Sequence, residues 1–186
     1  IVNSVVAGFG NLAALESKQK FKEVFDEANF IGFWIFGLCA VCLFVLLPSF
    51  IELWIGETYL IDAASFTLIL VNFYLQGQSV VYNNARIAKG NFNKDKWWSL
   101  LQAIINLVVS IVCALQFGLV GVFIGTVVSR LVFVISRPCS TYRFLFGCSP
   151  WRYFADIAKY GFFAILAVVV ATSVSSIFLE ELSIAN

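Results

Sequence analysis

The chain has 186 residues, of which 61% are hydrophobic and 12% are charged, with a formal net charge of +1. About a quarter of the residues of a globular protein are charged, so a soluble domain of this composition would expose large apolar patches. The composition therefore excludes an ordinary soluble domain and favours lipid as the solvent; we expect a membrane lipid bilayer and no nucleic acid as the surroundings.

Long apolar runs predict transmembrane helices, because a helix needs roughly 20 apolar residues to cross a hydrocarbon core of about 30 Å. In chain order, we expect residues 1–15 to be the end of a truncated transmembrane helix. Residues 31–135 are expected to hold four full spans and residues 161–179 a fifth. The four spans cover residues 31–51, 63–81, 99–117 and 119–135. The runs lack the period-two alternation of barrel strands, which predicts an all-α, polytopic transmembrane helical bundle.

Two segments between these spans are expected to lie at the membrane surface. In residues 16–30, apolar side chains recur at helical spacing opposite lysines, which is typical of an amphipathic helix lying on the cytoplasmic surface. The apolar positions are Phe21, Val24, Phe25 and Ala28. Residues 136–160 are expected to be a cytoplasmic connection, in which Ser149 caps an interfacial helix whose first residue is Pro150.

The loops predict an orientation, because Lys and Arg accumulate on the cytoplasmic side of a membrane. With the five spans above, all 12 basic residues fall on one side or just inside it. They are Lys18, Lys20, Lys22, Arg86, Lys89, Lys94, Lys96, Arg130, Arg137, Arg143, Arg152 and Lys159. The opposite side carries only acidic residues, such as Glu57 and Asp62. Residues 16–30 are therefore predicted to be cytoplasmic and the C-terminus to lie outside.

Polar residues within the spans are the candidates for a substrate path, because polar groups in hydrocarbon tend to face the bundle interior or a wet cavity. These candidates are Asn72, Gln76, Asn83, Arg86, Gln102, Asn106 and Arg130. The alternative for each amide is an ordinary interhelical hydrogen bond, worth about 0.6 kcal/mol on average. A guanidinium suits phosphate geometry, but both arginines also lie close enough to the cytoplasmic boundary to reach the headgroups.

The remaining sequence patterns indicate close helix packing and give no sign of catalysis. Gly121, Gly125 and Ser129 recur at four-residue spacing, which lets another helix approach closely. The chain has no histidine, nucleophile elbow or Walker loop, so we expect no catalytic residues, no metal, no cofactor and no enzyme. The five cysteines, including the pair Cys39 and Cys42, are interpreted as small apolar residues.

Six strings, taken together and in order, resemble the C-terminal portion of Wzx-type polysaccharide flippases of the multidrug/oligosaccharidyl-lipid/polysaccharide exporter superfamily. They are GNLAALES (10–17), FIELWIGETYL (50–60), NFYLQG (72–77), AKGNFNKDKWW (88–98), AIINLVVSI (103–111) and GLVGVFIGTVVSRL (118–131). The resemblance covers roughly residues 5–165, and none of the strings is a catalytic motif.

The resemblance implies part of the C-terminal lobe of a two-lobed exporter in the bacterial cytoplasmic (inner) membrane, with the N-terminal lobe of the same chain missing as its partner. It implies alternating access and a lipid-linked oligosaccharide as substrate, carried on a polyprenyl pyrophosphate to the outer leaflet. Relatives often have a basic residue where this chain has Ser79, and a second basic position that matches Arg86. The resemblance therefore favours Arg86 as the contact for the pyrophosphate.

Two other functions stay open at this point. A multidrug or cation antiporter of the same superfamily would rely on intramembrane carboxylates, and the spans of this chain hold none at mid-membrane depth. A non-transporting membrane scaffold would use its spans for packing alone. It would bury the polar face of residues 99–117, around Asn106, against neighbouring helices.

Overall fold

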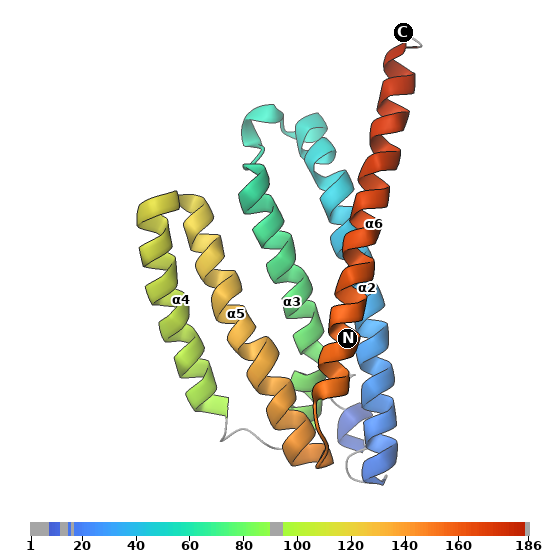
Figure 1. Ribbon diagram of the computed structural model, residues 1–186, viewed down its shortest axis with the longest axis vertical. Helices are drawn as coiled ribbons and strands as arrows, with labels where there is room; N and C mark the ends of the chain where they lie inside the picture. The colour runs from blue at the N-terminus through green and yellow to red at the C-terminus, as the bar shows by residue number, and fades with distance from the viewer. Residues whose placement is uncertain (1–7, 12–14, 16, 90–94, 185–186) are drawn as a thin grey trace.

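The computed structural model describes residues 8–11, 15, 17–89 and 95–184. Within these residues it contains helices and turns and no strand (Figure 1). The elements are α2 (Lys18–Trp54), η1 (Glu57–Tyr59), α3 (Ala63–Ala88), α4 (Asp95–Phe117), α5 (Leu119–Thr141), η2 (Tyr142–Phe146) and α6 (Trp151–Ile184). The predicted all-α bundle is confirmed. Most of the expected truncated helix, residues 1–15, lies outside the described residues.

Four helices in the described part of the chain are long and apolar enough to cross a membrane. They are α2, α4, α5 with its continuation through η2, and α6. Their apolar windows are at most one-third buried, and those of α4 and α6 have no buried residue. Apolar helices that stay uncovered are expected where the solvent is lipid. The length and the apolar composition of these helices are thus those of a multi-pass membrane protein.

The predicted span at residues 63–81 differs from the other four. The helix is there, as α3, and its 26 residues are long enough to cross a bilayer. It is not among the four apolar helices, because its C-terminal half carries amides and an arginine. That half is also the most buried stretch of the described chain, since α3 packs between α2 and α5. Most of its polar side chains, including Gln78, Asn84 and Arg86, therefore face protein.

The expected surface helix at residues 16–30 is not a separate element. Ser17 caps α2 by accepting a hydrogen bond from the Lys20 backbone N–H at 3.2 Å, and the helix then runs without a break to Trp54. The apolar side of its first turns does not lie on lipid. Phe21 and Phe25 are 1% and 0% exposed, and both pack against Phe146. The segment is an amphipathic helix, as the sequence indicated, but its apolar face packs against the protein core.

The expected interfacial helix near Ser149 is likewise the beginning of a longer element. A π-helical turn, η2, follows α5 directly, and Gly147 ends it with a positive φ of 71°. The next helix, α6, then runs from Trp151 to Ile184 without interruption, so the predicted fifth span and its lead-in are one helix. A left-handed residue at this point favours glycine, because a Cβ would clash with the backbone.

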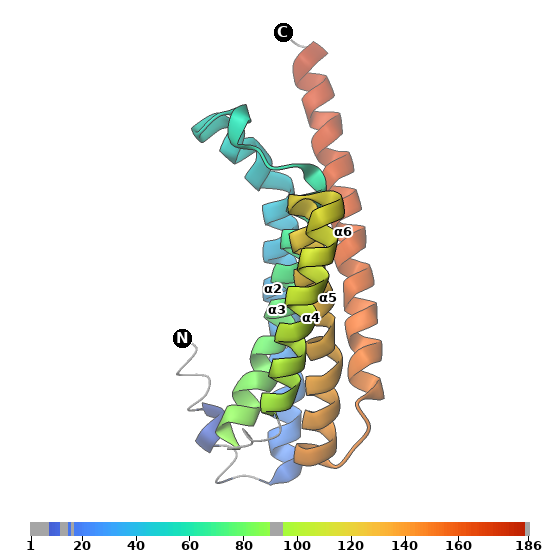
Figure 2. The same cartoon turned by 90° about the vertical axis from the view of Figure 1, so that its left-hand side faces the viewer.

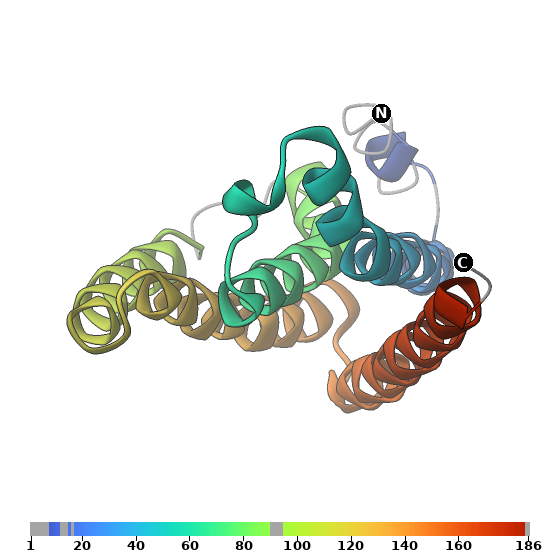
Figure 3. The ribbon, with the colours of Figure 1, turned by 90° about the horizontal axis from the view of Figure 1, so that it is seen from above.

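The helices stand side by side in an open row. Contacts link α4 to α5, α5 to α3, α3 to α2, and α2 to α6. Figure 3, seen along the helices, shows α4 and α6 at opposite ends of this row. Figure 2 shows the loop around η1 leaning away from the other helices.

The tightest contact in the row joins α4 and α5. The two helices are connected through Gly118, whose φ of 59° suits glycine. A Cβ on Gly121 would lie 2.5 Å from the Ala114 backbone nitrogen, and one on Gly125 would lie 2.5 Å from the Ser110 backbone nitrogen. Only a hydrogen fits at these positions. The predicted small-residue stripe is therefore the surface on which α4 packs.

The described basic side chains lie toward one end of the bundle. The beginnings of α2, α4 and α6 and the ends of α3 and α5 all meet there (Figure 1). Contacts confirm the grouping, because the Lys89 ammonium lies 5.0 Å from the centre of the Phe21 ring. We call this end the basic end. Arg130 lies farther from the basic end than Arg137, the other basic residue of α5.

An aromatic core closes the basic end. Its buried rings come from α2, α3, η2 and α6: Phe21, Phe25, Tyr82, Tyr142, Phe146 and Tyr153. Ring centres lie 5.1 Å apart between Phe25 and Phe146 and 5.6 Å apart between Tyr142 and Tyr153, in tilted arrangements. Such pairs add about 0.5–1.5 kcal/mol each beyond the area they bury. This core joins α2, α3 and α6 to η2, the continuation of α5.

Candidate functional site

The candidate site is a polar seam between α3 and α5, with Arg130 at its centre. Arg130 donates from Nε to the Asn72 Oδ1 at 3.1 Å and from Nη2 to the Gln76 Oε1 at 3.2 Å. Asn72 and Gln76 are one helical turn apart on α3, so both amides reach the same guanidinium. The structure thus brings together three of the residues predicted from the sequence.

The charge of Arg130 is not neutralised by the groups that hold it. Both partners are neutral amides, and no carboxylate pairs with Arg130 among the described residues. The side chain is partly exposed and Gln76 is exposed, so the guanidinium reaches the surface of the row. The amides fix its orientation and leave further N–H donors for another acceptor. A phosphate or carboxylate is the acceptor that a guanidinium fork suits best.

A second arginine continues the seam toward the basic end. Arg137 donates from Nη1 to the Asn83 Oδ1. Its guanidinium carbon also lies 3.7 Å from the centre of the Phe133 ring, one turn earlier on α5. Sequence reasoning placed Asn83 in the site but left Arg137 in the loop region. The signal was available, because residues 130 and 137 are two helical turns apart and share a face.

The third arginine of the group is in the interior. Arg86 is only 3% exposed, near the end of α3. Tyr82, one turn earlier on α3, is also buried, at 1% exposed. Of the two arginines predicted as substrate contacts, Arg130 reaches the surface and Arg86 does not.

The residues predicted on α4 lie apart from the seam. The Asn106 Nδ2 donates to the Ser129 Oγ at 3.1 Å, and the Ser110 Oγ donates to the Val122 carbonyl oxygen at 3.4 Å. Ser129 is 1% exposed and belongs to the small-residue stripe of α5. Gln102 is half-buried on α4. The polar face of α4 thus supports the packing of α4 on α5, as the packing alternative for these residues expected.

The described residues contain no group of three or more His, Cys, Asp or Glu side chains that could hold a metal ion. All five cysteines lie within the described ranges and are free thiols there. Among the residues that the structure describes, the charged side chains of the seam are Arg86, Arg130 and Arg137. A set of guanidinium groups can bind an anion such as a phosphate or a carboxylate.

Comparisons with protein-family models, with curated proteins and with solved structures find no match for this chain.

Proposed function

We propose that the chain is part of a membrane transporter that flips a polyprenyl-pyrophosphate-linked oligosaccharide from the cytoplasmic to the outer leaflet by alternating access, for surface polysaccharide biosynthesis. The observation that carries this proposal is the Arg130 guanidinium, which two neutral amides orient at the surface of the α3–α5 seam. A pyrophosphate needs positive charge along its route, and this guanidinium has no carboxylate partner among the described residues.

Arg130 replaces Arg86 as the main candidate for the pyrophosphate contact. Arg86 matches the basic position expected from the family resemblance, but at 3% exposure a ligand at the surface of the row does not reach it. We propose that Arg86 and Arg137 raise the positive potential of the seam, while Arg130 makes the contact. The six strings that resemble Wzx-type flippases support a lipid-linked oligosaccharide as the substrate class.

The basic end supports a proposed orientation in the membrane. The positive-inside rule assigns this end to the cytoplasm, which is where a polyprenyl-pyrophosphate-linked oligosaccharide is assembled. The seam extends from the basic end into the apolar part of the row, along Arg86, Asn83, Gln76 and Asn72 of α3. We propose that the substrate's charged group enters at the basic end and that the bacterial cytoplasmic membrane is the location. The open face of the row would then contact the N-terminal lobe implied by the resemblance.

A transport assay in vesicles that contain the full-length protein tests the proposal. Arg130→Gln removes the charge and keeps a side chain that can hydrogen-bond to Asn72. Loss of one charged hydrogen bond to phosphate, worth about 1.5–3 kcal/mol, corresponds to a rate lowered by at least about tenfold. Arg130→Lys keeps the charge but loses the bidentate hydrogen-bond geometry of the guanidinium. Its transport rate is therefore expected to lie between that of the wild type and that of Arg130→Gln.

Arg143→Gln is the matched control, because Arg143 is exposed in η2, beyond the seam. It removes the same charge and is expected to transport at the wild-type rate. Equal rates for Arg130→Gln and Arg143→Gln would contradict the role of the seam in transport. Arg86→Ala in the same assay separates the two arginines, since it changes the potential of the seam without touching the surface contact.

A scaffold function is the second candidate, and one observation favours it for α4. The polar face that was expected to line a path is used in helix packing through Asn106 and Ser129. A scaffold would treat the α3–α5 seam in the same way, as a set of interhelical hydrogen bonds. The two candidates differ in whether the seam takes up water, which labelling at Gln76 measures.

A further inference from the structure

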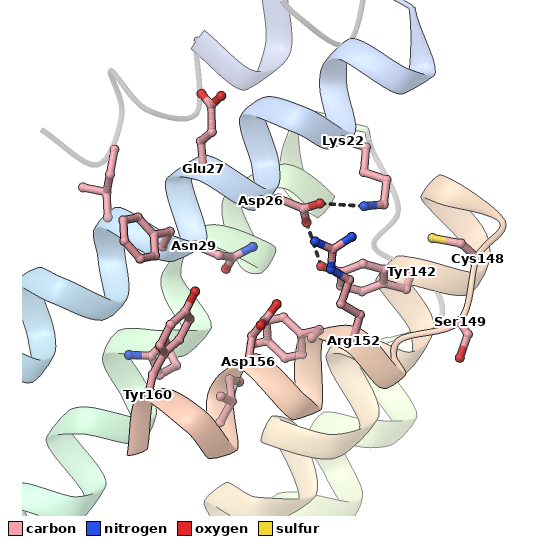
Figure 4. A pocket seen from close by; sticks show the side chains of 15 residues that line it. Lys22, Asp26, Glu27, Asn29, Tyr142, Cys148, Ser149, Arg152, Asp156 and Tyr160 are labelled. Atoms are coloured by element: carbon pink, nitrogen blue, oxygen red, sulfur yellow. Dashed lines mark hydrogen bonds and ion pairs between the residues drawn. The ribbon is translucent and has the colours of Figure 1, made fainter. Parts of the chain in front are cut away.

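A cavity of about 650 Å³ opens at the basic end between α2, η2 and α6. Figure 4 shows Lys22 and Asp26 on α2, Tyr142 on η2, and Arg152 and Asp156 on α6 around it. This volume is within the range of small-ligand sites. The cavity lies on the side of α2 and α6, whereas the seam lies between α3 and α5, so nothing in the proposed transport function uses it.

One pair of charges in the cavity is already satisfied within the protein. The Lys22 Nζ lies 2.5 Å from the Asp26 Oδ2, and the Tyr142 hydroxyl donates to the Asp26 Oδ1 at 2.8 Å. Asp26 therefore has a cation on one oxygen and a hydroxyl on the other. This trio forms one wall of the cavity and fixes α2 against η2.

Two further charges on α6 are not satisfied in this way. Arg152 and Asp156 have no ion-pair partner in the described part of the chain, although both line the cavity. They are four residues apart, which places their Cβ atoms about 5–6 Å from each other on one helix face. The cavity thus presents one cation and one anion as near neighbours. Counting all lining side chains, two cations and three carboxylates leave a net charge of −1.

The interior of the cavity holds polar atoms without partners. The Gln78 Nε2 and the Tyr153 hydroxyl are buried and have no hydrogen-bond partner among the described residues. Gln78 is 7% exposed and Tyr153 6% exposed, and both line the cavity from different helices. A buried donor without a partner costs about 1–3 kcal/mol. Such atoms indicate a ligand that enters and satisfies them.

The opening of the cavity continues into apolar helix surfaces. Phe30, Ile31 and Tyr160 lie at its α2–α6 edge, and Tyr160 stacks on Phe33 with ring centres 4.2 Å apart. Farther along the same two helices, large apolar side chains are exposed. They include Trp34, Ile35 and Leu38 on α2 and Phe162, Phe163 and Ile165 on α6. A ligand with a charged headgroup and apolar chains matches a charged cavity that continues into apolar helix surfaces.

We infer that the cavity binds the headgroup of an aminophospholipid, a phosphatidylethanolamine, from the leaflet at the basic end. The phosphate is bound by Arg152, with the Tyr153 hydroxyl and the Gln78 amide as further donors. The primary ammonium is bound by Asp156 and lies among the faces of the surrounding tyrosines. The acyl chains follow the exposed apolar surfaces of α2 and α6.

The charges of the cavity favour a phosphatidylethanolamine over an anionic phospholipid, a choline headgroup or a sugar. The phosphate of an anionic phospholipid can bind Arg152, but its headgroup has no cation to pair with Asp156. The net charge of the cavity is also already negative. A choline headgroup has the right charges, but its quaternary ammonium donates no hydrogen bond to a carboxylate. A sugar satisfies the amide and hydroxyl groups and leaves both charges without a counter-ion.

Native mass spectrometry of the purified protein tests the inference. The protein is mixed with equal amounts of phosphatidylethanolamine, phosphatidylcholine and phosphatidylglycerol in mild detergent, and the retained lipids are counted. One charged hydrogen bond more for the ethanolamine corresponds to a preference of at least about tenfold over phosphatidylcholine. Asp156→Asn is expected to remove this preference. Arg152→Gln is expected to lower retention of all three lipids.

Lys159→Gln is the matched control, because Lys159 is an exposed charge on the same helix that does not line the cavity. It is expected to retain phosphatidylethanolamine as the wild type does. Equal retention of the three lipids by the wild type, or equal retention by Asp156→Asn and Lys159→Gln, would overturn the inference. Displacement of the lipid by a soluble oligosaccharide would also overturn it, in favour of a sugar site.

The wild-type competition decides the question even where a variant does not fold. The test is also separate from the transport assay, because it measures lipid retention and not movement. A protein that retains phosphatidylethanolamine but transports no oligosaccharide would contradict the proposed function alone. A protein that transports without lipid preference would contradict the inference alone.

Discussion

Arg130 and Asn72 are 58 residues apart in the chain, yet the Arg130 Nε donates to the Asn72 Oδ1 at 3.1 Å. Three more polar residues extend this contact along α3 and α5: Gln76, Asn83 and Arg137. A charge held by neutral amides in an apolar surrounding is costly unless it serves a ligand or is relieved by water. The contact between these two residues thus joins α3 to α5 and orients the guanidinium that we propose binds the substrate.

The Tyr142 hydroxyl is expected to stabilise the basic end through its bond to Asp26. Tyr142→Phe removes one hydrogen bond to a carboxylate and changes little else, because the ring stays in the aromatic core. We expect it to lower the free energy of unfolding by about 1–2 kcal/mol, at the low end for a charged acceptor because Asp26 is partly exposed. Reversible unfolding in detergent measures the change. Tyr59→Phe, on an exposed tyrosine of η1, is the control and should be neutral.

The α4–α5 contact is expected to tolerate no side chain at Gly125. Gly125→Ala places a methyl group against the Ser110 backbone, so the two helices must separate. Overpacking of this kind costs about 1–3 kcal/mol. Gly161→Ala is the matched control, since a Cβ there meets nothing within 4 Å and alanine favours a helix. Thermal unfolding that is the same in both variants would contradict the close approach.

The cap of α3 is expected to depend on pH. Asp62 accepts a hydrogen bond from the Ser65 backbone N–H at 2.8 Å, and this contact lowers the pKa of the Asp62 carboxyl. A carboxyl whose folded-state pKa is lowered contributes its full stability above its unfolded value, about pH 3.9, and loses that contribution as the pH falls through the folded value.

The comparison between Asp62→Asn and the wild type measures this dependence. Asparagine caps a helix about as well as aspartate but does not titrate. Thermal unfolding should therefore give a difference between the two proteins that is constant near neutral pH and shifts in favour of the asparagine variant below about pH 4. A difference that stays constant down to pH 2 would show that the carboxylate does not cap the helix in its ionised form.

Cysteine labelling is expected to separate the seam from the α4 packing face. In a background where the five native cysteines are replaced, Gln76→Cys should react with a water-soluble maleimide, because Gln76 is exposed beside Arg130. Asn106→Cys and Ser110→Cys should be protected, because both positions contact α5. Strong labelling at both residue 76 and residue 106 would contradict the packing of α4 on α5. Protection at all three positions would favour the scaffold function.

The sequence by itself determined that the chain is helical and apolar enough for membranes. Hydrophobic length alone is sufficient for this, because a span in lipid has to satisfy its own backbone groups. It also predicted a span that begins at residue 63 and a break between spans at residue 118, which are where α3 begins and where α4 turns into α5. The candidate arginine Arg130 and its two amide partners were likewise among the residues that the sequence marked.

Only the tertiary structure decided which polar residues meet. The apolar face of residues 16–30 looks the same in sequence whether it covers lipid or Phe146, because both are equally apolar partners. Periodicity places a side chain on one side of its own helix, but the neighbour of that side depends on how the helices are ordered in the row. This is why Asn106 joined the packing surface, Arg86 the interior and Arg137 the seam.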